Sequence, residues 1–266
     1  MKGPRVKRTP TITMLLAIGL LGCGRQQASI TMAGSTAFQP FAEKLAEQYM
    51  IGHPDVSITV QGGGSAVGIQ SALSGAAQIG MADLVQLPPE AKDLTAVAVA
   101  RDGIAVVVNP ANAVAGLTMA QVRGIFNGTI RNWKEVGGAD APITVVSREA
   151  GSGTRTSFEQ IVGGIVLSQD ALIQDSNGTI RETVANDANA VGYLSHGLLN
   201  EKIKALQADG RDCTTEAIMA GTYTLVRPIY LLVRGAGSEQ IAAFIGYVLS
   251  PEGQQTIKAN GLIPVK

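Results

Sequence analysis

The sequence of 266 residues predicts an α/β fold made of two lobes. Segments with helical periodicity alternate along the chain with short β-rich segments, which is typical of sheets covered by helices. The segments Leu94–Ala100 and Ile104–Asn109 are almost continuously apolar, as expected for buried strands of a mainly parallel sheet. No Pro/Ser-rich linker separates two consecutive domains, so we expect the chain to pass back and forth between the lobes.

The first third of the chain alternates strands and helices. Short alternating or apolar segments predict the strands, and apolar residues that recur at i, i+3, i+4 and i+7 predict the helices. The strands are Ser29–Ala33, Val56–Val60 and Gln78–Met81; the helices are Phe38–Met50 and the segment that carries Ile69, Ala72, Leu73 and Ala76.

The rest of the chain continues this alternation. The β-rich segment Tyr223–Val233 contains Pro228, which cannot donate to a strand ladder, so we expect a bend or a change of sheet there. A further strand is predicted at Ile143–Val146, and helices at Leu117–Phe126, Phe158–Ile165, Ile180–Ala185, Leu198–Leu206, Ile241–Leu249 and Gln254–Ala259.

The composition excludes several classes of protein. Apolar residues make up 45% of the chain, which supports a sizeable core. The formal net charge is 0, so there is no basic excess with which to bind nucleic acid. Two cysteines and two histidines exclude a disulfide scaffold and a Cys/His zinc site. We expect no metal and no organic cofactor.

The N-terminal residues have the pattern of a targeting signal. Residues 1–22 combine a basic start with the apolar stretch Ile12–Leu21, which is too short to span a bilayer and has the size of a signal-peptide core. The sequence Leu20-Leu21-Gly22-Cys23 resembles a bacterial lipobox, in which the cysteine carries the lipid. We therefore expect a lipid anchor on Cys23, with 23–28 as a short leash; an ordinary cleaved signal with an incidental cysteine is the alternative.

Three clusters of glycine and hydroxyl residues each follow a strand and open a helix. Parallel strands end at one edge of their sheet, where ligands collect. A helix N-terminus offers free N–H groups and a partial positive charge, so the clusters suit a small oxyanion. Simple N-capping by Ser and Thr is the alternative for each cluster. The clusters are Gly34-Ser35-Thr36, Gly64-Ser65 and Gly151-Ser152-Gly153-Thr154.

Two charged residues accompany the clusters. Arg148 precedes Ser152 by four residues and can supply a bidentate contact to an anion; a surface ion pair is its alternative role. Asp83 stands just past the strand Gln78–Met81. A carboxylate in an anion site is useful only if the anion carries a proton, as phosphate does and sulfate does not, so Asp83 predicts discrimination between them. The alternative is that Asp83 caps or salt-bridges a structural loop.

These motifs occur together in an order that resembles a known family. The sequence is similar to the phosphate-binding proteins of bacterial ABC transporters over nearly the whole chain after Cys23. The segments that carry the resemblance are 33–40, 61–65, 79–83, 117–128 with Trp133 and 136–138, 148–155, 175–178 and 190–193.

The resemblance implies a type II periplasmic-binding-protein fold with a ligand cleft between two lobes. The lobes are expected at 29–104 with 228–266 and at 105–227. The implied function is to bind inorganic phosphate outside the cytoplasmic membrane and deliver it to an ABC permease, as a lipid-anchored monomer. The implied ligand residues are Ser35, Thr36, Ala37 through its N–H, Ser65, Asp83, Arg148, Ser152, Gly153 and Thr154, with Arg155 as an addition.

Other functions compete for the same residues. A receptor for sulfate, molybdate or tungstate would share the helix N-termini, but fully ionised anions would be repelled by Asp83. A serine hydrolase would need Ser65 or Ser152 as nucleophile with His53 or His196 as base, yet neither serine lies in a nucleophile-elbow pattern. We therefore expect no catalysis. A sensor or scavenger of phosphate is a further alternative.

Overall fold

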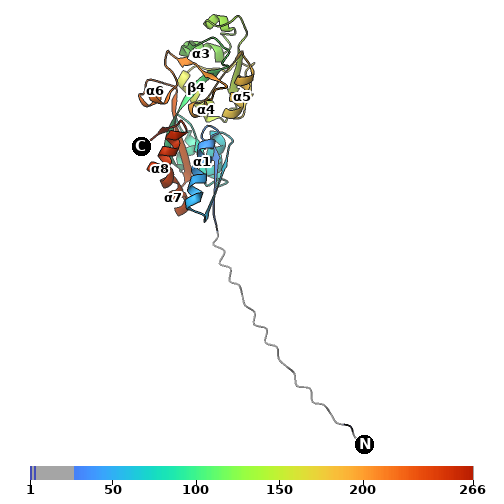
Figure 1. Ribbon diagram of the computed structural model, residues 1–266, viewed down its shortest axis with the longest axis vertical. Helices are drawn as coiled ribbons and strands as arrows, with labels where there is room; N and C mark the ends of the chain where they lie inside the picture. Colours follow the sequence, from blue (N-terminus) through green and yellow to red (C-terminus); the bar gives the residue numbers. More distant parts are fainter. Residues whose placement is uncertain (2, 4–26, 266) are drawn as a thin grey trace.

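The computed structural model describes Met1, Gly3 and residues 27–265. The predicted signal peptide beyond Met1 and Gly3, and Cys23 with its lipid anchor, lie outside the described residues. Figure 1 shows two lobes stacked along the long axis, one with α1, α7 and α8 and the other with α3, α4 and α5. None of the helices within 27–265 has the length and hydrophobicity of a membrane span.

The first lobe is built on three parallel strands. Strand β1 (Ala28–Gly34) lies between β2 (Val56–Gln61) and β3 (Ile79–Ala82) and runs parallel to both. Two crossover helices, α1 (Gln39–Gly52) and α2 (Ser65–Ser74), connect them. The C-terminal helices α7 (Glu239–Val248) and α8 (Pro251–Ala259) pack beside α1. The short helix η1 (Pro89–Asp93) precedes β4, and its Ala91 packs with residues of α2.

Two long antiparallel strands run between the lobes. Strand β4 (Leu94–Val108) pairs along Leu94–Gly103 with β11 (Val226–Arg234), and along Ile104–Val108 with β8 (Ala190–Ser195) of the second lobe. We predicted two strands here, because Arg101-Asp102-Gly103 interrupts the apolar pattern. The structure has one, because the charge of Asp102 faces Arg227 across the β4–β11 ladder instead of solvent.

The second lobe continues the same sheet beyond β4. Strand β8 pairs in parallel with β6 (Thr144–Arg148), which pairs in parallel with β7 (Leu172–Gln174). Its helices are α3 (Met119–Phe126), α4 (Gly153–Val162), α5 (Asn177–Asn186) and α6 (Thr215–Met219). Smaller elements are β5 (Gly116–Leu117), η2 (Trp133–Val136), η3 (His196–Leu198), β9 (Lys204–Ala205), β10 (Gln207–Ala208) and, after α8, β12 (Ile263–Pro264).

Two further expectations differ from the structure. The predicted helix Leu198–Leu206 is wrong: the chain forms η3 and then the short strand β9 beside β4. The sheet is mixed rather than mainly parallel, because β4 and β11 run antiparallel to their neighbours.

Pro228 lies inside β11, in the part of the strand that pairs with β4 but not with β3, where a missing N–H is tolerated. A register irregularity follows at Ile229/Tyr230, but β11 stays in one sheet, so the change of sheet that we considered does not occur.

Separate hydrophobic cores fill the two lobes. The first lobe buries Phe41, Leu45 and Phe244 with strand residues of β1 to β3, and the second buries Phe126, Trp133 and Phe158 with residues of β4, β6 and β8. Ile263 packs with the second core although it is close to the C-terminus. The residue limits that we expect for the lobes stay a prediction.

Candidate anion-binding site

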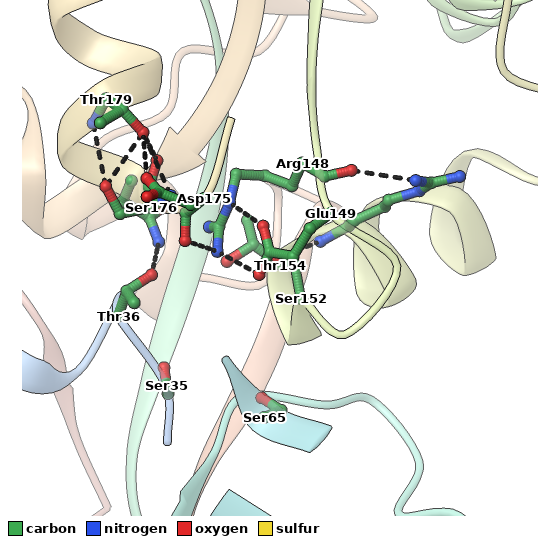
Figure 2. A network of polar contacts seen from close by, with 12 residues as sticks. Ser35, Thr36, Ser65, Arg148, Glu149, Ser152, Thr154, Asp175, Ser176 and Thr179 are labelled. Atoms are coloured by element: carbon green, nitrogen blue, oxygen red, sulfur yellow. Dashed lines mark hydrogen bonds and ion pairs between the residues drawn. The ribbon is translucent and has the colours of Figure 1, made fainter. Parts of the chain in front are cut away.

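The three hydroxyl clusters lie at the carboxyl ends of parallel strands, as the sequence predicts. The first follows β1, which ends at Gly34; the second follows β2; the third follows β6, which ends at Arg148. Figure 2 shows Ser35, Thr36 and Ser65 of the first lobe on one side, and Arg148, Ser152 and Thr154 of the second lobe on the other. The clusters of the two lobes thus face each other.

Ser152 also caps its own helix, and Ser35 makes a similar contact in the turn that precedes α1, whose N-cap is Phe38. Ser152 is the N-cap of α4 and its Oγ accepts a hydrogen bond from the N–H of Arg155 at 3.2 Å. Ser35 Oγ accepts from the N–H of Phe38, also at 3.2 Å. Capping therefore occurs at α4, but it uses the third N–H after Ser152. The N–H groups of Gly153 and Thr154 belong to the first helical turn, which has no intrahelical acceptor for them.

Ser65 does not cap its helix and is bound to Asp83 instead. Its Oγ donates to Asp83 Oδ1 at 2.6 Å and accepts from the N–H of Asp83 at 3.0 Å. Thr154 Oγ1, from the opposite lobe, donates to Asp83 Oδ2 at 3.0 Å. Asp83 is 1% exposed. The structure thus brings Asp83 together with Ser65, Gly153 and Thr154, four of the predicted site residues.

Arg227 pairs with Asp83 and was not predicted as a site residue. Its Nη1 lies 2.8 Å from Asp83 Oδ2, and its Nη2 lies 2.8 Å from Asp102 Oδ2. The alternative we considered for Asp83, a structural ion pair, is therefore present in the structure. A signal for Arg227 existed in the sequence, since it is a charged residue inside the β-rich segment Tyr223–Val233.

Arg148 has one side of its guanidinium engaged and the other without a partner. Nε donates to Glu149 Oε2 and Nη2 donates to Glu149 Oε1, both at 2.9 Å, and Nη2 also donates to the carbonyl of Asp175 at 3.2 Å. Arg148 is 1% exposed, and its Nη1 is buried with no hydrogen-bond partner among the described residues. Buried polar groups are seldom left unpaired, so this nitrogen is suited to a ligand.

Thr36 is held by a residue of the second lobe. Asn177 is the first residue of α5, and its Nδ2 donates to Thr36 Oγ1 at 3.0 Å. The N–H of Ser195 donates to Asn177 Oδ1 at 3.1 Å, and Ser195 Oγ donates to Asp102 Oδ1 at 2.9 Å. A chain of polar contacts, buried except at Thr36, therefore connects Thr36 with Asp102 and, through Arg227, with Asp83. Asn177 lies in the motif 175–178, so the motif pointed to the segment but not to this role.

The lobes contact each other around these residues. The N–H of Ala66 donates to the carbonyl of Gly151 at 3.1 Å, and Ser157 Oγ donates to the carbonyl of Asp83 at 3.0 Å. A cavity of about 220 Å³ opens beside them and is lined by both lobes, including Ser65, Gln86 and Gly153. Asp83, Ser65 and Thr154 thus lie at the junction of the lobes, and of the predicted site residues Ser65 and Gly153 also line the cavity.

The charges of the site nearly cancel. Arg148 and Arg227 face Glu149, Asp83 and Asp102. Burial raises the pKa of Asp102, although Arg227 and the Ser195 hydroxyl oppose the shift. A bound anion would therefore depend on oriented N–H and O–H donors and on the unpaired Arg148 nitrogen more than on a net positive charge.

Other candidates take different positions. Arg155, the additional ligand residue, donates from Nη1 to the carbonyl of Arg148 at 2.9 Å and pairs through Nε with Glu159. It therefore holds the backbone of Arg148 in place. His196 Nδ1 contacts the carbonyl of Gly261, and His53 stacks on Tyr49. The structure pairs neither histidine with Ser65 or Ser152. Within the described residues, no group of three or more His, Cys, Asp or Glu side chains could hold a metal ion.

Comparison with known proteins places the chain in a family. Residues 23–252 match the model of the PBP superfamily domain. The Bacillus subtilis phosphate-binding protein PstS is 33% identical over 246 residues, which cover 91% of this chain and 82% of that protein. The chain belongs to the phosphate-binding proteins of the PBP superfamily.

Solved structures of the family have the same fold. A Clostridium perfringens protein described as a phosphate ABC transporter substrate-binding protein, solved with bound phosphate, superposes with a TM-score of 0.87 at 39% identity, covering 90% of this chain and all of the other. An ABC-type phosphate transport receptor from Vibrio cholerae gives a TM-score of 0.75 at 38% identity, covering 88% of this chain and 99% of that one. The type II fold expected from the sequence is thereby confirmed.

Proposed function

We propose that this protein binds inorganic phosphate between its lobes and delivers it to an ABC permease for import. The observation that carries the proposal is the unpaired Nη1 of Arg148, which is buried at the carboxyl end of β6, shortly before the N-terminus of α4. Its relatives are named as phosphate-binding and phosphate-transport proteins, and one is solved with phosphate. Both observations point to the same ligand class.

The proposed ligand contacts come from both lobes. The first lobe contributes the N–H groups and hydroxyls of the cluster after β1, the hydroxyl of Ser65 and the carboxylate of Asp83. The second contributes the guanidinium of Arg148 and the N-terminus of α4. The contacts that we propose are with Ser35, Thr36, Ala37, Ser65, Asp83, Arg148, Ser152, Gly153 and Thr154.

Asp83 is proposed to select the ligand. As an ionised group its carboxylate only accepts hydrogen bonds, and it lies between Ser65 and Thr154. Phosphate near neutral pH carries at least one O–H, which can donate to a carboxylate oxygen. Sulfate, molybdate and tungstate have no such proton and would meet Asp83 oxygen to oxygen. A site built to pair one hydrogen bond discriminates by up to about 10⁴–10⁵ against an analogue that lacks it.

Binding and delivery require the lobes to move. The contacts between Thr36 and Asn177 and between Asp83 and Thr154 bridge the lobes, so they stabilise the closed arrangement. A ligand that touches both lobes adds contacts that exist only when they are closed and shifts the equilibrium accordingly. We propose that the closed form is what the permease recognises.

The cellular setting is part of the proposal. We propose that Cys23 carries lipid, that the protein faces the exterior of the cytoplasmic membrane as a monomer, and that it is not an enzyme. The contacts of Ser152 support the last point, because its Oγ caps α4.

Isothermal titration calorimetry tests the proposal directly. The protein is titrated with phosphate, sulfate and molybdate at two pH values between which phosphate changes its protonation state. Tight binding of phosphate and weak binding of the other two is expected. Equal or tighter binding of sulfate or molybdate would make the protein a receptor for another oxyanion, and release of product from a phosphate ester would make it a hydrolase.

A further inference from the structure

One arginine serves two buried carboxylates behind the anion site. Arg227 of β11 contacts Asp83 and Asp102, each at 2.8 Å, and the three side chains are 0%, 2% and 0% exposed, respectively. Asp102 lies on β4 directly opposite Arg227 in the ladder, at the point where β4 passes from the first lobe to the second. Asp83 belongs to the proposed ligand contacts, whereas Arg227 and Asp102 do not.

An ionised carboxylate at this depth requires a cation. Burial without a partner strongly disfavours the charged form, and such a group takes up a proton instead. The charged groups near Asp83 are Arg227 from β11 and, beyond it, Asp102 from β4; Ser65 and Thr154 supply neutral hydroxyls. The other buried arginine, Arg148, is bound to Glu149. Arg227 is therefore the guanidinium that contacts Asp83.

The protonation of Asp83 decides which hydrogen bonds it can make. An ionised Asp83 accepts from a ligand O–H, while a protonated Asp83 would donate to any bare anion oxygen and would no longer repel it. Asp102 competes for the same guanidinium, but it also receives the hydroxyl of Ser195 at 2.9 Å. The planar fork of Arg227 contacts both acids at once, which the single ammonium of a lysine does less well.

We propose that Arg227 is a positioning residue that sets the ligand specificity of the site: by holding Asp83 as an ionised acceptor, it makes the site select tetrahedral oxyanions that carry a proton. Asp102 weakens the interaction between Arg227 and Asp83, because it pairs with the same guanidinium. The inference rests on the proposed function, since it concerns how that site distinguishes phosphate from sulfate. In this role Arg227 acts through Asp83, whose Oδ2 lies 2.8 Å from Arg227 Nη1.

The test measures the ratio of the Kd for sulfate to the Kd for phosphate by calorimetry. Arg227→Met removes the cation at similar volume and is expected to lower the ratio about tenfold or more, because the Asp83 carboxylate then loses the guanidinium that contacts it. Arg181→Met, at a partly exposed helix position, is the matched control and should leave the ratio unchanged. A folded Arg227→Met protein with the wild-type ratio would overturn the proposal.

A second pair of variants decides the matter if Arg227→Met does not fold. Arg227→Lys keeps the charge but offers one ammonium to two acids, so the ratio is expected to fall. Adding Asp102→Asn to Arg227→Lys removes the competing acid and should restore the ratio, which a merely structural role of Arg227 does not predict. A wild-type ratio in Arg227→Lys, or a loss that Asp102→Asn does not relieve, would overturn the inference. Failure of the wild-type protein to bind phosphate would instead refute the proposed function itself, and the inference with it.

Discussion

Ser65 and Asp83 exchange two hydrogen bonds, one from the Ser65 hydroxyl to Asp83 Oδ1 and one from the Asp83 N–H back to Ser65 Oγ. The first residue of α2 is thereby hydrogen-bonded to the residue that follows β3. We call these two residues the Ser65–Asp83 pair. Thr154 and Gly153 of the second lobe lie against the Ser65–Asp83 pair.

Replacement of Arg148 should weaken phosphate binding. Arg148→Ala removes the unpaired Nη1 and leaves the Glu149 carboxylate without its partner beside the ligand. A charge-assisted contact is worth about 1.5–3 kcal/mol, so the Kd should rise about tenfold or more. Calorimetry measures the change, and Arg181→Ala on the surface serves as control. An unaltered Kd would show that Arg148 does not bind the ligand.

Replacement of Asp83 should reduce selectivity. In Asp83→Asn the amide can donate to a bare anion oxygen, so the sulfate-to-phosphate ratio of Kd values should fall about tenfold or more. Asp93→Asn, at an exposed position of η1, is the control. If the Asp83→Asn protein binds both anions with the wild-type ratio, the proton of the ligand is not what this carboxylate recognises.

A methyl group at Gly153 should prevent the lobes from closing. A Cβ there would overlap Ser65 Oγ and crowd Asp83 Oδ1, both on the opposite lobe. Such overpacking typically costs about 1–3 kcal/mol, which predicts a loss of phosphate affinity of about 5- to 150-fold. Gly246→Ala in α7 is the control, because nothing lies within 4 Å of its Cβ. The midpoint of thermal unfolding without ligand should barely change, because the substitution affects only the closed form. A wild-type phosphate affinity of Gly153→Ala would argue against closure of the lobes over this contact.

The stability of the protein should depend on pH through Asp102. Burial raises its pKa in the folded protein above the ordinary 3.8, so the folded state binds this proton more tightly than the unfolded chain. The contribution of Asp102 to the free energy of unfolding therefore falls as pH rises from 3.8 through the folded pKa. Asp102→Asn removes this dependence and should gain stability relative to the wild type as pH rises. Denaturant unfolding across this pH range measures the difference; a constant difference would contradict the raised pKa.

The lipid anchor is tested outside the described part of the chain. Cys23→Ser removes the acceptor of the lipid and should move the protein from the membrane fraction to the soluble fraction of cells. Cys213→Ser is the matched control, since Cys213 is buried in the second core and should not affect the distribution. Retention of the Cys23→Ser protein in the membrane fraction would refute the anchor.

Local patterns in the sequence predicted the positions of the three clusters. Gly64 and Gly153 mark places where the chain must approach other groups closely, and both were found as parts of helix-opening motifs. The ends of β1, β2 and β6 could be predicted because these strands are short and are followed by glycine or hydroxyl residues. Arg148 was found because it lies within four residues of one cluster.

The long-range contacts could not be predicted in this way. Arg227 follows Asp83 by 144 residues and Asp102 by 125, and only the register of β11 on β4 brings it to both. The same register explains why we predicted two strands where the structure has the single strand β4. A charged residue such as Asp102 in an apolar segment indicates the end of a strand unless its partner is known. Glu149 and Asn177 acquire their roles only through the side chains that they contact.

The long strand β4 has a consequence for dissection of the protein. Val99 and Ala100 belong to the core of the first lobe, and Ile104 to Val108 belong to the core of the second, on a single uninterrupted strand. A protease cut or a circular permutation within this strand would therefore damage two cores at once. The first lobe cannot be expressed as a contiguous fragment that retains its interior, because its core combines residues from Ile30 to Ala100 with residues from Ile229 to Leu262.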